Sequence, residues 1–236
     1  PEALKDKRVR QAMSFAIDRD VIVDRILQGG QKPAYNWTHW AIADFERPEI
    51  AYADEMDQPE RIAKAKELMQ EAGYGPDNPL TLRLQYNTSD DHKKIAIAAS
   101  QMLKAIGVNA TLDNYEWKIH TDRMQNQDFD MARYAWCGDY NEASTYLDLM
   151  TSYSGHNNGQ WFNDQYDKIM ADSKTAADPQ PLYKEAEALL ADEMPIIPIY
   201  HYAKVDMINP VIKGLPQNNV QNTWYGKDLY RVAAEE

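Results

Sequence analysis

The stretch LTLRLQYNTSDDHKKIAIAASQMLKAIGVNATLDNY, residues 80–115, decides the fold of this chain. Residues 80–86 alternate between apolar and polar side chains, which is the two-residue period of a half-buried strand. Ser89 or Asp90 then begins a helix, because short polar side chains accept hydrogen bonds from the free amides of a first turn. Gly107 ends that helix, and residues 108–115 predict a second strand. The stretch therefore predicts a β-α-β unit.

The chain continues this pattern beyond residue 115. Residues 116–126 predict a short helix and residues 129–136 predict a third strand, which extends the order to β-α-β-α-β. Strands that alternate with helices tend to pair in parallel and to carry the helices on the faces of their sheet. We therefore predict an α/β fold in which a mixed sheet is flanked by helices.

Helices are also predicted on both sides of this unit. Residues 6–27 carry apolar side chains at helical spacing behind Asp6, a residue suited to cap the helix. Residues 31–57 lack a sustained period and are rich in aromatic side chains, so they predict a long loop. The remaining predicted elements are helices at residues 58–72, 163–175 and 179–192, a helical turn at 146–150 and a strand at 195–202. Residues 210–236 carry no strong apolar stripe of their own.

Composition excludes several classes of protein. The 236 residues include 25 Lys and Arg against 37 Asp and Glu, and the net charge of −12 argues against a non-specific nucleic-acid binder and a polybasic membrane-surface protein. No run approaches the roughly 18 apolar residues of a membrane-spanning helix. The 15 Tyr and 6 Trp against 4 Phe favour a ligand-binding surface, although half-buried strand positions explain the Tyr excess equally well.

The sequence carries no signature of an enzyme or of a cofactor site. It lacks the glycine-rich loops that hold nucleotides and the Gly-x-Ser-x-Gly turn of serine hydrolases. Its five histidines are never three or four positions apart and Cys137 is its single cysteine, so we expect neither a metal nor another cofactor. A hydrolase acting on peptides or glycans remains the alternative from another class, because its nucleophile and base are recognised only by geometry.

A further segment, DMARYAWCGDYN at residues 130–141, favours a ligand site at the end of the third strand. A strand places Arg133 and Ala135 on the face opposite the two aromatic side chains. Asp139 could then bind an ammonium group and Arg133 a carboxylate, while the strand edge pairs with an extended peptide backbone. The alternative is a half-buried strand that ends in a solvated turn.

Four segments together resemble a known family: residues 6–20, 86–94, 132–142 and 195–202. The family comprises the peptide- and nickel-binding solute-binding proteins of ABC importers, and the third segment, ARYAWCGDYNE, is the most specific. The resemblance implies a two-lobed α/β clamshell of the type II periplasmic-binding class. It also implies that this chain matches the C-terminal portion of a longer protein, with residues 1–203 as the second lobe and residues 204–236 as a segment that returns to a first lobe absent here.

The resemblance implies a function and a location as well. Members bind an extended short peptide between the two lobes and deliver it to an ABC permease in the inner membrane, so we expect no catalysis and no nucleic-acid partner. We expect a monomer that is exported to the periplasm of a Gram-negative bacterium after its signal peptide is removed. A murein tripeptide or a dipeptide is the alternative ligand within the family.

The resemblance also assigns roles to residues of the predicted site. Asp139 matches the carboxylate that holds the N-terminal ammonium of the peptide, and Arg133 and His92 match groups that meet its C-terminal carboxylate. Alternatively, His92 is a solvated residue at a helix start. The other candidates are Ala135 and Cys137, whose backbone pairs with the ligand, Trp136 at a side-chain pocket, Tyr140 in the adjoining turn and Tyr202 near the hinge.

Two positions depart from the pattern of the family, and a third, Cys137, matches it but lacks its expected partner in this sequence. Close members carry a lysine near residue 27, and Lys32 or Arg25 are the candidates to replace it. An arginine expected before the third segment is replaced by Met124. Cys137 matches a cysteine whose disulfide partner would lie before residue 1, so we expect its thiol to be free.

Overall fold

Three parallel strands form the central sheet of the computed structural model, which describes residues 1–204, 206–217, 219 and 223–233. Their order is β3-β2-β4, with β2 (Leu80–Asn87) between β3 (Val108–Tyr115) and β4 (Met131–Ala132). β2 is buried along most of its length, as expected for a central strand covered on both faces. The predicted α/β class is confirmed, and the antiparallel pairs of described strands lie in two smaller sheets.

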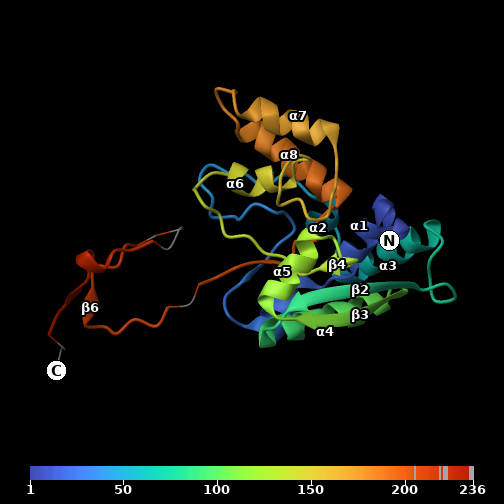
Figure 1. Ribbon diagram of the computed structural model, residues 1–236, viewed down its shortest axis with the longest axis horizontal. Helices are drawn as coiled ribbons and strands as arrows, with labels where there is room; N and C mark the ends of the chain where they lie inside the picture. The colour runs from blue at the N-terminus through green and yellow to red at the C-terminus, as the bar shows by residue number, and fades with distance from the viewer. Residues whose placement is uncertain (205, 218, 220–222, 234–236) are drawn as a thin grey trace.

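Two helices cover the faces of this sheet (Figure 1). α4 (Asp90–Lys104) joins β2 to β3, and α5 (Trp117–Gln125) joins β3 to β4. The two connections run in opposite directions across the sheet, so right-handed crossovers place the helices on opposite faces. Because all three strands are parallel, their carboxyl ends meet at one edge, beside the first turns of both helices.

The first predicted helix is interrupted. After η1 (Glu2–Lys5), α1 (Lys7–Ala16) begins as predicted behind the Asp6 cap, but it ends early, and a separate wide helical turn, η2 (Val21–Leu27), follows. Between α1 and η2, the fully buried side chain of Arg19 takes the carbonyls of Ser14 and Ile17. These carbonyls belong to the last turn of α1, where intrahelical amides run out, and the buried guanidinium satisfies them there.

The larger of two apolar clusters lies between the sheet and three helices. α3 (Gln58–Glu71) begins with a capping box in which Asp57 and Glu60 each accept the backbone amide of the other. It packs against α1, and α4 packs against β3. The buried side chains at the centre of this cluster include Val9, Met13, Ile22, Met69, Leu82, Leu103 and Ile106.

A second apolar cluster lies among the helices of the C-terminal half, drawn in yellow and orange in Figure 1. It is formed by α6 (Ser144–Leu147), the turn η3 (Asp148–Met150), α7 (Asp164–Ser173) and α8 (Gln180–Glu193). Tyr166, which is fully buried, lies within it. The sequence predicts α7 and α8 to within two residues at each end, and the single helical turn predicted at 146–150 is α6 followed by η3.

The carboxylate of Glu187, on α8, bonds to the long aromatic loop predicted at residues 31–57. It is fully buried and accepts the amides of Trp37 and Thr38, at 3.0 and 2.5 Å. Burial raises the pKa of this carboxyl, and the bonds from Thr38 and Trp37 oppose that change. The part of the loop near Trp37 is thereby held against the second apolar cluster, whereas Tyr52 of the short helix α2 (Ala51–Asp54) packs in the larger one.

Replacing Glu187 with glutamine is expected to lower the free energy of unfolding by about 2 kcal/mol. A glutamine side chain offers one oxygen and an NH₂ group, so one of the two backbone amides would face another donor. Urea denaturation of this variant and of Glu185→Gln, an exposed control on the same helix, measures the difference. Equal stability of the two variants would show that the buried charge is dispensable.

The predicted strand at residues 195–202 is reduced to two residues. β5 (Tyr200–His201) pairs antiparallel with β1 (Lys32–Pro33) in the long loop. The two prolines earlier in the segment lack the amide hydrogens that a longer ladder would need. The small sheet nevertheless brings the loop and the end of the segment together beside the central sheet.

The C-terminal segment, which begins at Lys204, extends away from both apolar clusters (Figure 1). Its described residues include an antiparallel pair, β6 (Ile212–Lys213) and β7 (Tyr230–Arg231), with the turn η4 (Gly226–Asp228) between them. Large apolar side chains are exposed along it: Met207, Ile208, Trp224, Tyr225 and Tyr230. Across the described part of the chain, no helix combines the length and the apolar character needed to cross a membrane.

Candidate functional site

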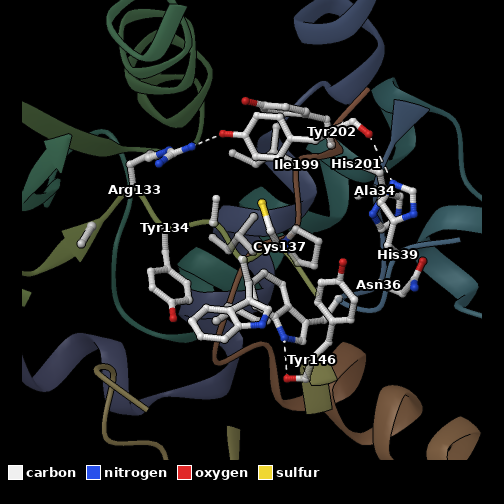
Figure 2. Close-up of a pocket in the computed structure, with 18 of the residues that line it drawn as sticks. Ala34, Asn36, His39, Arg133, Tyr134, Cys137, Tyr146, Ile199, His201 and Tyr202 are labelled. Atoms are coloured by element: carbon white, nitrogen blue, oxygen red, sulfur yellow. Dashed lines mark hydrogen bonds between the residues drawn. The ribbon is translucent and has the colours of Figure 1, made fainter. Parts of the chain in front are cut away.

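A cavity of about 1840 Å³ lies between the carboxyl edge of the sheet and the second apolar cluster. Most of its lining comes from residues 30–42, 129–138, 156–162 and 193–204. Figure 2 shows Arg133 and Tyr134 on one side of it and His39 and His201 on the other. The cavity therefore lies outside the carboxyl ends of parallel strands, where α/β sheets commonly bind ligands.

β4 ends at Ala132, so the predicted strand at residues 129–136 is wrong in its length. The Arg133 amide still donates to the Gln85 carbonyl at 2.8 Å, but the Arg133 carbonyl accepts from the ring of His120 in α5, at 2.9 Å. The chain leaves the sheet at this point and continues along the cavity. The predicted alternation of faces after Arg133 therefore does not apply.

The guanidinium of Arg133 points toward the segment that contains β5 (Figure 2). It donates to the hydroxyl of Tyr202 and, at 3.4 Å, to the side-chain oxygen of Asn87 at the end of β2. No carboxylate of the described residues forms an ion pair with it, so its charge is available to an anionic group. Burial, followed by the charge of Arg133, lowers the pKa of His92, which also lines the cavity.

The segment at residues 134–137 carries unpaired backbone groups along the cavity wall. Its amides and carbonyls form no hydrogen bond with any part of the chain that the structure describes. The backbone is bonded again at Gly138, whose amide donates to the Tyr146 hydroxyl at 3.2 Å. Backbone groups normally find partners, so this segment is suited to pair with an extended chain that enters the cavity.

Aromatic side chains form one wall of the cavity. Trp37 stacks on Tyr134 with ring centroids 6.1 Å apart, and it meets the Tyr146 ring edge-on at 6.0 Å. Trp136 packs on His156, with ring centroids 4.8 Å apart. Burial raises the pKa of Tyr134 to about 12, so its hydroxyl stays protonated at neutral pH. A wall of this kind accepts apolar side chains of different shapes.

The opposite wall carries basic side chains near the small β1–β5 sheet. The Lys32 Nζ atom lies 3.7 Å from the centre of the Trp40 ring, and the rings of His39 and His201 lie 5.0 Å apart. Burial, with smaller effects from His39 and Lys32, lowers the pKa of His201 to about 4. Of the two predicted replacements for the family's lysine, Lys32 lines the cavity, whereas Arg25 is not among the lining residues.

The structure brings most of the predicted site residues together. The ones that line the cavity are His92, Arg133, Ala135, Trp136, Cys137, Tyr140 and Tyr202. Asp139 is not among them; the residue is exposed, and its amide donates to the Thr145 hydroxyl at 2.9 Å. Cys137 is exposed and forms no disulfide within the described chain. The role of each residue in binding stays a prediction.

Sequence reasoning missed the contribution of the long aromatic loop, which places Trp37 and His39 in the cavity wall. The available signal was its aromatic content, which does not tell which side chains turn inward. Met124, at the position of the family's arginine, is buried and lines the cavity, and the neighbouring Arg123 pairs with Asp128 at 2.8 Å. Within the described ranges, no group of three or more His, Cys, Asp or Glu side chains could hold a metal ion.

An α/β sheet with an open cavity and a free cation at its carboxyl edge is an arrangement suited to binding a solute. The family profile of the bacterial extracellular solute-binding proteins, family 5 (middle), matches residues 1–158. The chain therefore belongs to this family, which is one of binding proteins rather than of enzymes.

Individual relatives are named for the peptides that they bind. The chain is 42% identical over 231 residues to the periplasmic murein peptide-binding protein MppA of Escherichia coli, covering 96% of this chain and 43% of that protein. It is 40% identical over 233 residues to the periplasmic oligopeptide-binding protein OppA of Salmonella typhimurium, covering 96% of this chain and 42% of that protein. The chain thus spans less than half the length of the curated relatives it matches.

A solved structure agrees with these relationships. The murein tripeptide binding protein MppA of Escherichia coli superposes with a TM-score of 0.91 at 40% identity, over 98% of this chain and 46% of that one. The predicted fold of the type II periplasmic-binding class is confirmed by this likeness.

Proposed function

We propose that this chain acts in the substrate-binding component of an ABC importer, which binds extended short peptides and delivers them to a membrane permease. The observation that carries the proposal is the unpaired backbone at residues 134–137, next to the available guanidinium of Arg133. A peptide satisfies both features, since its backbone can pair with the segment while its carboxylate meets the cation. The relatives named for peptides support the same conclusion.

Within this proposal, each predicted site residue has a role. Arg133 and His92 receive the C-terminal carboxylate, and Asp139 receives the N-terminal ammonium from its exposed position beyond the unpaired segment. The backbone of Ala135 and Cys137 pairs with the peptide. The remaining contacts come from side chains on the cavity wall, namely Trp136, Tyr140 and Tyr202.

The proposal also covers the arrangement of the whole protein. Residues 1–203 form the second lobe of a clamshell, and residues 204–236 return to a first lobe. The exposed apolar side chains of the C-terminal segment support the second part, because they are suited to a partner surface. The lobes close around the peptide by a hinge motion, and the permease recognises the closed monomer in the periplasm.

A murein tripeptide is the second candidate ligand, and the likeness to MppA favours it. A dipeptide is a further alternative within the family. Competition between a murein tripeptide and an ordinary tripeptide for the same site distinguishes them. A hydrolase would return cleaved peptides after prolonged incubation, whereas a binding protein returns them intact.

Titrating the 236-residue chain with tri- to pentapeptides, followed by amide NMR, tests the proposal. We expect shifts concentrated at residues 133–141. Replacing Asp139 with alanine is expected to weaken the binding of free-amine peptides about tenfold, because a charge-assisted hydrogen bond is lost. N-acetylated peptides should bind both proteins equally, and Asp24→Ala, an exposed carboxylate outside the cavity lining, is the matched control.

Two outcomes would contradict these expectations. Equal losses for acetylated and free-amine peptides would remove Asp139 from the ammonium site. If neither this chain nor a two-lobed form that contains it shifts on addition of millimolar peptide, the ligand is not a peptide.

A further inference from the structure

The backbone of Arg133 is fixed from two sides. Its amide donates to the Gln85 carbonyl at 2.8 Å, and its carbonyl accepts from His120 Nε2 at 2.9 Å. In a parallel ladder, the next bond would join the Arg133 carbonyl to the Asn87 amide, two residues further along β2. That bond is not formed in the described structure, and the His120 ring takes its place.

His120 is buried outside the cavity lining. Its side chain is fully buried on α5 and is not among the residues that line the cavity, so it has no direct access to a ligand. Its carbonyl accepts from the Gln85 side chain at 3.4 Å, and the same side chain accepts from Arg123. The Gln85 and Arg123 side chains thus bond next to the backbone of His120, and the bond of its ring goes to the Arg133 carbonyl.

The hydrogen bond determines which nitrogen of the ring carries the proton. A backbone carbonyl can only accept, so the proton must lie on Nε2. Burial lowers the pKa of His120, and its Nδ1 atom has no partner in the described chain, so the ring is neutral with Nδ1 unprotonated. The ring thus supplies one fixed donor to one fixed acceptor.

We propose that His120 is a positioning residue, which donates from Nε2 to the Arg133 carbonyl, ends β4 there, and so sets the place where the Arg133 guanidinium meets the carboxylate of the ligand. This inference rests on the proposed function of Arg133. Without the donor, the Arg133 carbonyl is free to continue the ladder with Asn87. That change would rotate the Arg133 guanidinium away from the place where it meets the carboxylate.

Two variants separate positioning from folding. His120→Gln can keep an N–H donor near the position of Nε2, whereas His120→Leu fills the space without one. We expect His120→Leu to weaken the binding of free-acid peptides about tenfold and to leave the corresponding C-terminal amides unchanged. His120→Gln should restore most of the difference in affinity between free-acid peptides and the corresponding C-terminal amides. In an Arg133→Met background, His120→Leu should have no further effect on peptide affinity.

A measurement without ligand complements the binding data. Nitrogen-15 NMR of the histidine rings in the unliganded chain reports the tautomer, and we expect His120 to be neutral with its proton on Nε2. A proton on Nδ1, or equal losses for acids and amides in His120→Leu, would overturn the positioning role. If the native chain binds free-acid and amidated peptides with equal affinity, the proposed role of Arg133 is wrong. The tautomer of His120 then still shows whether its ring donates to the Arg133 carbonyl.

Discussion

Replacing Arg19 with methionine is expected to lower the free energy of unfolding by about 4 kcal/mol or more. The guanidinium is fully buried and donates to four backbone carbonyls and one hydroxyl at 2.7–3.1 Å. Its acceptors belong to Ser14, Ile17, Ala34 and Pro198. It also lies 4.5 Å from the centre of the Tyr35 ring.

The size of this effect follows from what the substitution leaves behind. Methionine fills much of the space, but it donates no hydrogen bond, so four carbonyls lose a partner inside the protein. Each buried unsatisfied group costs about 1–3 kcal/mol. The same change also removes the bonds to Ala34, which follows β1, and to Pro198, which precedes β5. We therefore expect the cavity wall formed by these segments to become less rigid.

Urea denaturation of Arg19→Met, Arg19→Lys and Arg25→Met measures this effect. Arg25 is exposed, and its replacement should change stability by no more than about 0.5 kcal/mol. Lysine retains a charge at position 19 but has three donors on one nitrogen, so it should recover part of the loss. A loss below about 1 kcal/mol in Arg19→Met would mean that water replaces the guanidinium at these carbonyls.

The elements that the sequence predicts well are those whose cause is local. The strands and helices between residues 80 and 126 follow from alternation, helical spacing and polar caps, all of which act within a few positions. Gly107 has a φ of 81°, and a Cβ there would lie 3.0 Å from the backbone of Gly75, so a glycine is required where the helix stops. Such constraints are visible in the residues themselves.

The elements that differ are those that depend on tertiary contacts, which lie outside the reach of a strand or helix period. Arg19 lies where the first helix is interrupted, and besides Ser14 and Ile17 it bonds to the carbonyls of Ala34 and of Pro198, the latter 179 positions away in the sequence. β4 ends where the ring of His120, on α5, bonds to the carbonyl of Arg133. No local period reports either contact.

The candidate site also has features that the residue types predict and features that only tertiary contacts determine. The segment that follows β4 could be predicted from its residue types, since a cation, aromatic side chains and a turn occur together. The direction of Asp139 could not, because its amide bonds to Thr145 and its side chain is left exposed. The contribution of Trp37 was equally hidden, because its neighbours Tyr134 and Tyr146 are about a hundred positions further along the chain.

Lowering the pH from 7 to 4 is expected to cost the fold about 3 kcal/mol through His201. Burial, followed by the charges of His39 and Lys32, lowers the pKa of His201 to about 4 in the folded chain. An unfolded histidine has a pKa of about 6.5. Between these values the unfolded state binds more protons, so stability falls as the pH is lowered through 6.5 and the loss is nearly complete at the folded pKa.

The variant His201→Phe tests this expectation, because phenylalanine retains an aromatic ring against His39 but does not titrate. The difference in unfolding free energy between pH 7 and pH 4.5 should shrink by about 2 kcal/mol in the variant. It should not vanish, since burial also lowers the pKa of His39, His92 and His120. Lys32→Met should reduce the difference less, because it removes a smaller cause of the shift than burial. If His201→Phe loses as much stability in acid as the native chain does, the proton uptake that weakens the fold occurs elsewhere.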